Sequence, residues 1–332
     1  GFGRGLNQKV AVYDHGGGTC DISVLEIGTV VFEVLATCGD TYLGGDDFDD
    51  RVIELLAAEF MSQHGINLRT DMYALEKLKL AAENAKRGLS MEDEVEIRIP
   101  DVARGDDGQS LSLDRTLTIK EFAALVNDLV LRTFKVCDEA LQQAGVTTRD
   151  LEGVILVGGP TRLGIIRDAV TQYFGQDPKT DVDPDEVVAM GAAIHAASLV
   201  SDTVSESDAF LLDVTPLSLK IGVAGGLAEP VIERNTPVPI EQTRTFTTYQ
   251  DMQEAVRIRV FQGEGRQTEE NEMLGQFEFS GFEARARGQV KIDVTFEIDA
   301  DGILSVTARD QESGQQASTT ITLNSALSDT EM

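Results

Sequence analysis

The residues best suited to chemistry lie between two apolar runs, from Asp14 to Asp21, where the chain reads Asp-His-Gly-Gly-Gly-Thr-Cys-Asp. Three consecutive glycines remove every Cβ from the turn, so backbone N–H groups can approach an anion closely. The carboxylate of Asp14 suits a hydrated Mg²⁺, which takes oxygen ligands and keeps several waters. Thr19 and Asp21 add a hydroxyl and a second carboxylate. These residue types predict a phosphate cradle with a metal, although glycines that only close a hairpin give the same pattern.

Two glycine pairs farther along suit the same chemistry. Gly44 and Gly45 open a predicted helix, and a helix N-terminus presents unsatisfied N–H groups that bind phosphate. Gly158 and Gly159 follow the apolar strand predicted over 154–157 and precede another helix, an arrangement in which α/β sheets bind ligands. An ordinary turn with an N-cap is the alternative for the first pair.

A fourth candidate is the polar face of the helix predicted over 71–90. Glu83, Lys86, Arg87 and Ser90 recur at i, i+3, i+4 and i+7, so they share one face. Such a face is either a wall for the ribose and adenine of a nucleotide or a solvated surface with helical ion pairs. The spacing fits both.

The elements that position these residues fall into two classes. The first half combines strands over 9–38, 95–117 and 154–157 with helices to about 65 and over 71–90 and 118–145, and Asp183 to Glu186 caps a last helix; this mixture predicts an α/β domain. From 217 to 323, short alternating runs separated by turn residues predict an all-β sandwich. Ser201 to Asp208 is polar and acidic, as in a linker. Ala326 to Glu331 resembles the start of a helix.

Composition excludes several classes of function. The 332 residues are 42% hydrophobic and 26% charged, which indicates a soluble globular protein with room for two domains. The net charge of -29 argues against binding to nucleic acid and to anionic membranes. Cysteines at 20, 38 and 137 have no metal or disulfide spacing, which favours a reducing, cytoplasmic location. No run reaches transmembrane length, and no signal peptide is visible.

Six segments share the order and spacing of one family: 14–21, 39–49, 158–162, 183–186, 211–219 and 299–306. The chain resembles the seventy-kilodalton heat-shock chaperones, the DnaK family. The resemblance implies the second lobe of an actin-like (ribonuclease-H-like) ATPase domain over 1–200 and an interdomain linker over 201–214. It further implies an antiparallel β-sandwich that binds peptides over 215–325 and the start of a truncated helical lid over 326–332.

Within the lobe, the resemblance implies individual roles. Asp14 acts through Mg²⁺ and its waters, Thr19 helps to place the attacking water, and Asp21 supports the metal site. The residues expected to contact the phosphates or the adenosine of ATP and ADP are Gly16, Gly17, Gly18, Thr19, Gly44, Gly45, Glu83, Lys86, Arg87, Ser90, Gly158, Gly159, Arg162 and Asp185.

In the sandwich, the resemblance implies a cleft that binds exposed apolar segments of unfolded proteins. The positions that match its lining are Ile221, Phe246, Val256, Ile258 and Ile292, with Ala224 and Tyr249 arching over the bound backbone. The linker residues Phe210, Leu211, Leu212 and Asp213 would couple the two sites, so that ATP binding and hydrolysis switch peptide affinity. The implied partners are a J-domain co-chaperone and a nucleotide exchange factor.

Four positions depart from the family pattern. His15 stands where an apolar residue is usual, Cys20 where Phe is usual, Pro160 where a polar residue is usual, and Lys220 where Gly is usual. The first two adjoin the phosphate turn, which leaves open its packing and the reactivity of the thiol. The family's first lobe, with its catalytic Lys and Glu, has no counterpart in these residues. We therefore expect this chain alone not to hydrolyse ATP.

Three hypotheses remain. The favoured one is a segment of an ATP-dependent folding chaperone. The second is a degenerate module that holds apolar peptides without turnover. The third is an actin-like sugar or acetate kinase, against which the predicted sandwich argues.

Overall fold

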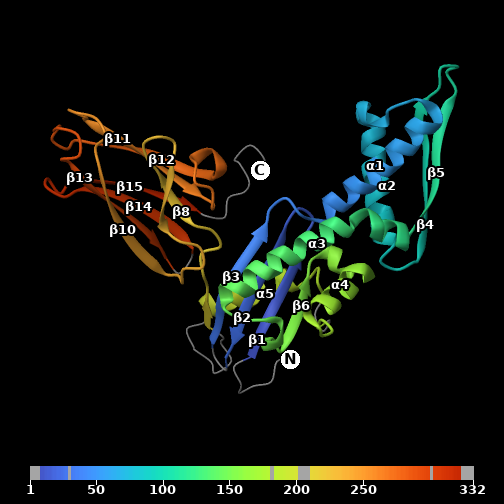
Figure 1. Cartoon of the computed structure of the whole chain (residues 1–332), viewed down its shortest axis with the longest axis horizontal. Helices are drawn as coiled ribbons and strands as arrows, with labels where there is room; N and C mark the ends of the chain where they lie inside the picture. The colour runs from blue at the N-terminus through green and yellow to red at the C-terminus, as the bar shows by residue number, and fades with distance from the viewer. Residues whose placement is uncertain (1–7, 29–30, 180–182, 201–209, 300–301, 323–332) are drawn as a thin grey trace. The chain divides into compact units, whose positions relative to one another are not determined.

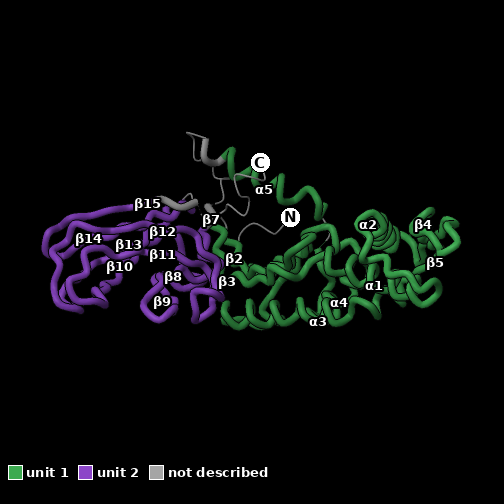
Figure 2. Tube along the Cα trace, turned by 90° about the horizontal axis from the view of Figure 1, so that it is seen from above, with its two compact units in different colours: residues 1–210 green, residues 211–332 purple. Residues whose placement is uncertain are grey.

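The computed structural model describes residues 8–28, 31–179, 183–200, 210–299 and 302–322 (Figure 1). The segments predicted as the acidic linker, 201–208, and as the start of a helical lid, 326–331, lie outside these residues. The chain divides into two compact units, residues 1–210 and 211–332 (Figure 2).

The first unit contains the strands β6, β1, β2 and β3 of one sheet, in that order, and the short strand β7 spans the boundary of the two units. Strands β1 to β3 form the predicted antiparallel meander, and β6 pairs with β1 in parallel. Long-range parallel pairing of this kind brings residue 154 beside residue 11, so the first and third glycine turns meet at one end of the sheet. The strands are β1 (Gln8–His15), β2 (Cys20–Ile27), β3 (Val31–Asp40), β6 (Gly153–Val157) and β7 (Phe210–Leu212).

The helices of this unit begin and end at the expected signals. Asp71 caps α2 by accepting hydrogen bonds from the N–H groups of Tyr73 and Ala74, and Thr118 caps α3. Gly65 and Gly145 end α1 and α3 in the left-handed conformation. The predicted helices over 71–90 and 118–145 are therefore confirmed. The helices are α1 (Gly45–His64), α2 (Met72–Gly88), α3 (Ile119–Ala144), α4 (Gly164–Phe174) and α5 (Val187–Val200).

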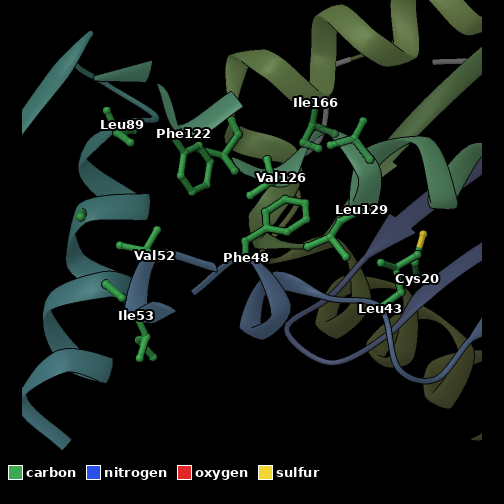
Figure 3. Packing of buried hydrophobic residues seen from close by; sticks show 14 of the residues in the cluster. Cys20, Leu43, Phe48, Val52, Ile53, Leu89, Phe122, Val126, Leu129 and Ile166 are labelled. Atoms are coloured by element: carbon green, nitrogen blue, oxygen red, sulfur yellow. The ribbon is translucent and has the colours of Figure 1, made fainter. Parts of the chain in front are cut away.

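A two-stranded hairpin and a single core complete the first unit. The hairpin consists of β4 (Glu94–Arg104) and β5 (Ser110–Thr118), and β4 packs against α2 (Figure 1). Helix α3 packs against β2 and β3. Figure 3 shows Phe48 and Phe122 between the helices, with ring centroids 6.2 Å apart in an edge-to-face arrangement. This core fixes α1 behind the first glycine turn.

The second unit contains two four-stranded sheets with the orders β10-β13-β14-β15 and β12-β11-β8-β9. Neighbouring strands in both sheets are antiparallel, and alternate residues of β13 and β14 enter one core shared by both sheets. The strands are β8 (Leu219–Gly222), β9 (Ala228–Ile232), β10 (Ile240–Thr247), β11 (Ala255–Gln262), β12 (Glu272–Ser280), β13 (Lys291–Ile298), β14 (Ile303–Asp310) and β15 (Gln316–Thr322).

Candidate functional site

The first glycine turn joins β1 to β2 in a tight four-residue connection. The register places Asp14 opposite Asp21 at its base, and the N–H of Gly16 donates to the carbonyl of Thr19 at 2.9 Å. The N–H groups of Gly17 and Gly18 have no hydrogen-bond partner among the described residues, and both glycines are exposed. Two free backbone donors at a turn without side chains are suited to an anion.

The protein's own geometry does not require these three glycines. None of them adopts a positive φ. A Cβ added to Gly18 would meet nothing within 4 Å, and at Gly16 and Gly17 the nearest atoms would lie 3.6 and 3.7 Å away. The open space above the turn is therefore space that a Cβ would fill, as expected where a ligand approaches the backbone.

The carboxylates beside the turn form a compact acidic group. Burial raises the pKa of Asp14, and the negative charge of Asp21 adds to the effect. Burial also raises the pKa of Asp21, while a hydrogen bond of 2.9 Å from the Thr19 hydroxyl lowers it and the charge of Asp40 raises it. Among the described residues, no three acidic, histidine or cysteine side chains form a metal site. A cation here would need water and phosphate oxygens, which is the chemistry of Mg²⁺.

The second glycine loop packs directly against this turn. The N–H of Gly45 donates to the carbonyl of Gly16 at 3.0 Å, and the N–H of Asp46 donates to that of Gly17 at 2.8 Å. A Cβ on Gly44 would lie 2.1 Å from the oxygen of Gly17. The first amides of α1, which the sequence suggested for phosphate, are thus engaged in holding the turn in place.

The third glycine loop contacts the turn from the β6 side. Gly158 has a φ of +89°, and a Cβ there would lie 2.1 Å from the carbonyl oxygen of His15. The hydroxyl of Thr161 donates to the carbonyl of Gly158 at 2.6 Å and steadies the loop. The three glycine segments that the sequence analysis singled out therefore meet at one point.

Arg162 and Asp185 lie together at the exit of this third loop. The Nε of Arg162 donates to Asp185 Oδ2 at 2.8 Å, and its Nη2 donates to Asp183 Oδ1 at 2.5 Å. Gly159 lies next to this cluster, since a Cβ on it would be 3.6 Å from Asp185 Oδ1. The guanidinium is thus held by two carboxylates, with part of its surface exposed.

The polar face of α2 divides into two parts. Glu83 and Arg87 form an ion pair of 2.6 Å along the helix, and the hydroxyl of Ser90 donates to the carbonyl of Arg87. Lys86 instead reaches α1, where its Nζ donates to Asp49 Oδ2 at 2.6 Å and to the carbonyl of Gly45 at 2.8 Å. Lys86 therefore ties α2 to the second glycine loop, while the side chains of Glu83, Arg87 and Ser90 make contacts only within their own segment among the interactions described.

Two side chains next to the turn have roles that the sequence did not predict. Asp49, the partner of Lys86, is buried, and only its position on the inner side of α1 could have indicated this. His15 is fully buried between the rings of Tyr13 and Phe48, and neither of its ring nitrogens has a hydrogen-bond partner in the part of the chain that the structure describes. Burial lowers the pKa of His15 to about 4, so the imidazole is neutral at pH 7.

The surroundings of Cys20 argue against a reactive thiol at this position. Its side chain is fully buried, and burial raises its pKa to about 12. A thiol that cannot form thiolate near neutral pH is a poor nucleophile and a poor metal ligand. The cysteine therefore serves the packing beneath the turn.

The second unit contains a cavity of about 1110 Å³. It is lined by residues of both sheets, and all seven positions proposed for a peptide cleft are among them. These positions grade from buried to exposed, as a cleft requires: three are buried, two are half-buried and two are exposed. In that order they are Ile221, Ile258 and Ile292; Phe246 and Val256; and Ala224 and Tyr249.

The proposed linker residues lie at the boundary of the two units. Phe210, Leu211 and Leu212 form strand β7, and the side chain of Leu212 is exposed. The carboxylate of Asp213 accepts a hydrogen bond from the N–H of Val214, and its carbonyl accepts one from Val238. The structure does not describe the side chains of Phe210 and Leu211.

One unit has a glycine turn with two free N–H groups beside paired carboxylates, and the other has a cavity lined by both of its sheets. Together the units make a multidomain α/β and β protein. Comparison with protein families gives the class. The family model described as Hsp70 protein matches residues 1–332, so the chain belongs to the Hsp70 family. Proteins of this family are ATPases that use ATP or ADP with Mg²⁺ and act as chaperones in protein folding, which decides against the sugar-kinase hypothesis. No helix within the described residues has the length and apolar character to cross a membrane.

Proposed function

We propose that this protein is a DnaK-like chaperone that binds exposed apolar segments of unfolded polypeptides and changes its affinity for them through ATP binding and hydrolysis. The observation that carries the proposal is the cavity of the second unit, whose lining includes every position expected for a peptide cleft. In this proposal, residues 1–200 form the second lobe of an actin-like ATPase domain, 201–214 the linker, 215–325 a peptide-binding sandwich and 326–332 the start of a lid.

The nucleotide would be held at the junction of the three glycine segments. The free N–H groups of Gly17 and Gly18 would bind phosphate oxygens, and Asp14 and Asp21 would hold the waters of Mg²⁺. When bound, the metal nucleotide supplies the phosphoanhydride that is hydrolysed. The Thr19 hydroxyl donates a hydrogen bond to the Asp21 carboxylate, so its lone pairs are free to accept a hydrogen bond from a water and orient it.

The adenosine side of the site is proposed to lie against Gly158, Gly159 and the Arg162–Asp185 pair, together with Glu83 and Arg87 of α2 and with Ser90 just after its end. Lys86 would position the second glycine loop instead of lining the adenosine, because its ammonium already donates hydrogen bonds to Asp49 and to the carbonyl of Gly45. Phosphoryl transfer depends on positioning and electrostatics from groups on both sides of the phosphate. We accordingly propose that these residues alone hydrolyse ATP no faster than buffer.

The peptide would lie extended in the cavity and place one Leu-like side chain on the buried floor formed by Ile221, Ile258 and Ile292. Fully burying such a side chain contributes about 1.5–3 kcal/mol, which favours apolar segments that a folded protein hides. The partners proposed with this activity are a J-domain co-chaperone and a nucleotide exchange factor. The three cysteines are free and buried, which supports a reducing, cytoplasmic location.

Enlarging one cavity residue tests the peptide site. Val256 is half-buried and lines the cavity, so Val256→Phe should fill it and weaken a leucine-centred peptide by at least ~1.4 kcal/mol, a tenfold change in affinity. Val306 is fully buried and does not line the cavity, so the control Val306→Phe should instead lower stability by about 1–3 kcal/mol. Fluorescence titration and thermal melts of both variants separate the two effects. Unchanged affinity with a lowered melting temperature in Val256→Phe would refute the assignment.

A further inference from the structure

The cavity of the second unit is lined by charged as well as apolar side chains. Arg257, Arg259 and Arg287 border it, together with Glu229 and Glu278. In a chain with 57 acidic and 28 basic residues, an excess of positive charge around one cavity is unexpected. It therefore calls for an explanation beyond the average composition of the surface.

None of the three guanidinium groups has an ion-pair or side-chain hydrogen-bond partner among the described residues. Arg285 of the same unit, by contrast, pairs with Glu283 at 2.6 Å and with Glu312 at 2.7 Å. Arg244, Arg266 and Arg309 of the second unit also lack such a partner among the described residues, so the cavity is distinguished by having three unpaired arginines around one space.

Arg259 is the best placed of the three to bind an anion. In the register of β11 and β12 it lies opposite the uncharged Gln276, whereas Arg257 lies opposite the acidic residue Glu278. Arg259 is half-buried, with its guanidinium 5.7 Å from the centre of the Phe261 ring. A Cβ built on Gly222 would lie 3.3 Å from its Nε, so the side chain rests against the backbone of β8.

A guanidinium that is held in place and still unpaired is suited to a carboxylate. Its planar fork matches the two carboxylate oxygens, and holding it beforehand lowers the entropic cost of binding. Glu229 and Glu278 would favour the opposite charge, but both are exposed, so water and salt screen them more strongly than the half-buried arginine.

The position of Arg259 indicates which part of a ligand it would meet. Successive side chains of a strand point to opposite faces, so Arg259 and the floor residue Ile258 lie on opposite faces of β11, although both border the cavity. A ligand that fills the floor with an apolar side chain would therefore meet the arginine with a residue to one side of it.

We propose that the cavity selects extended peptides in which a short apolar segment is flanked by Asp or Glu, whose carboxylate binds Arg259. This inference rests on the proposed function, because it presupposes that the cavity binds peptides. Arg257 and Arg287 add positive potential at the same mouth, and a lysine-flanked peptide is disfavoured by all three.

Three matched peptides test the inference on the 332-residue protein. Each has a Leu-Leu-Leu centre, blocked ends and one fluorophore, with flanks of Asp, Asn or Lys, and its affinity is measured by fluorescence anisotropy. We expect the order Asp, Asn, Lys, with about a fivefold difference between Asp and Asn, as for one partly buried charged hydrogen bond. Arg259→Gln should remove that difference and leave the affinity for the Asn peptide unchanged. Raising the salt concentration should reduce the difference in affinity between the Asp and Asn peptides in the parent protein.

The control variant is Arg309→Gln, which removes the same charge from an exposed position outside the cavity and should leave the order intact. Arg259→Lys keeps the charge without the fork and should retain only part of the preference; thermal melts establish that each variant is folded. Equal binding of the Asp and Lys peptides, or a preference that survives Arg259→Gln, would overturn the inference. The Asn peptide reports on the cavity alone, so its failure to bind would instead refute the peptide site itself, and the charge preference with it.

Discussion

Gly18 and Gly44 lie next to each other in the site but should respond in opposite ways to the addition of one methyl group. A Cβ on Gly44 would lie 2.1 Å from the oxygen and 2.4 Å from the carbonyl carbon of Gly17. Its backbone is extended, with φ −152° and ψ −171°, so alanine is conformationally acceptable there and the cost is purely steric. Gly18 has neither a positive φ nor an atom within 4 Å of the added Cβ.

The magnitudes follow from these contacts. Gly44→Ala must push α1 away from the turn, which costs about 1–3 kcal/mol for overpacking. It also strains the two hydrogen bonds from Gly45 and Asp46 to the turn, each contributing roughly 0.5–1.5 kcal/mol. Gly18→Ala should leave stability unchanged or raise it by about 0.4–1 kcal/mol, because alanine lowers the entropy of the unfolded chain. The same methyl group would occupy the space proposed for phosphate and should weaken nucleotide binding at least tenfold, or ~1.4 kcal/mol.

Chemical denaturation and calorimetric titration with Mg²⁺ and ADP measure the two effects on the same samples. Gly164→Ala, where an added Cβ also meets nothing, serves as the control outside the three glycine segments, at the start of α4. If Gly18→Ala binds nucleotide as well as the parent chain does, the turn is not a phosphate cradle. If Gly18→Ala loses as much stability as Gly44→Ala, the steric reasoning is wrong.

Three further predictions concern neighbouring features. The pKa of His15 is about 4 in the folded protein and near 6.5 in the unfolded chain, so between these values only the unfolded chain binds the proton and stability falls as the pH falls. Relative to the parent, the free energy of unfolding of His15→Leu, measured by urea denaturation, should therefore increase by roughly 3 kcal/mol when the pH is lowered from 7 to 4. The control His64→Leu, at an exposed position, should show no such increase. Parallel pH profiles of the parent and His15→Leu would contradict this prediction. Asp49→Ala leaves the Lys86 ammonium buried without its carboxylate partner and should lower the free energy of unfolding by about 3 kcal/mol. The double variant Asp49→Leu with Lys86→Met, which removes both charges, should lose less stability. A double variant as unstable as the single one would refute the pairing argument. In a form of the protein that responds to ATP, the double variant Leu211→Asp with Leu212→Asp should still bind both nucleotide and peptide. ATP should, however, no longer accelerate peptide release from it, as measured by stopped-flow fluorescence. Normal acceleration would reject the linker as the coupling element.

Much of the arrangement could be predicted from the sequence because it depends on local signals. The caps at Asp71 and Thr118 and the left-handed glycines at 65 and 145 mark the ends of helices without reference to the rest of the fold. The period of two in β13 likewise indicates which residues enter the core. The residues that line the cavity came from the family resemblance, because periodicity cannot separate a half-buried wall such as Val256 from a core position.

Contacts between distant segments account for what could not be predicted. The bond from Lys86 to Asp49 spans 37 positions, and the helical spacing of Lys86 only indicated a shared face with Glu83 and Arg87. His15 reads as a polar residue beside a polar turn, yet it is fully buried because Phe48 of α1 packs on its ring. No local rule places an unpaired imidazole in a core, since its burial costs free energy that only the whole fold can supply.

The close approach of the glycine segments has a consequence for related sequences. The fold itself demands glycine at 44 and 158, where a Cβ would meet the backbone of the turn at 2.1 Å, so these two positions should stay glycine in any descendant that keeps this architecture. Gly18 is under no such steric demand, and under the proposed function it remains glycine only while a nucleotide uses the space above it. Among diverged copies of this chain, a side chain at position 18 beside intact glycines at 44 and 158 would therefore mark lineages that have kept the structure and lost the nucleotide.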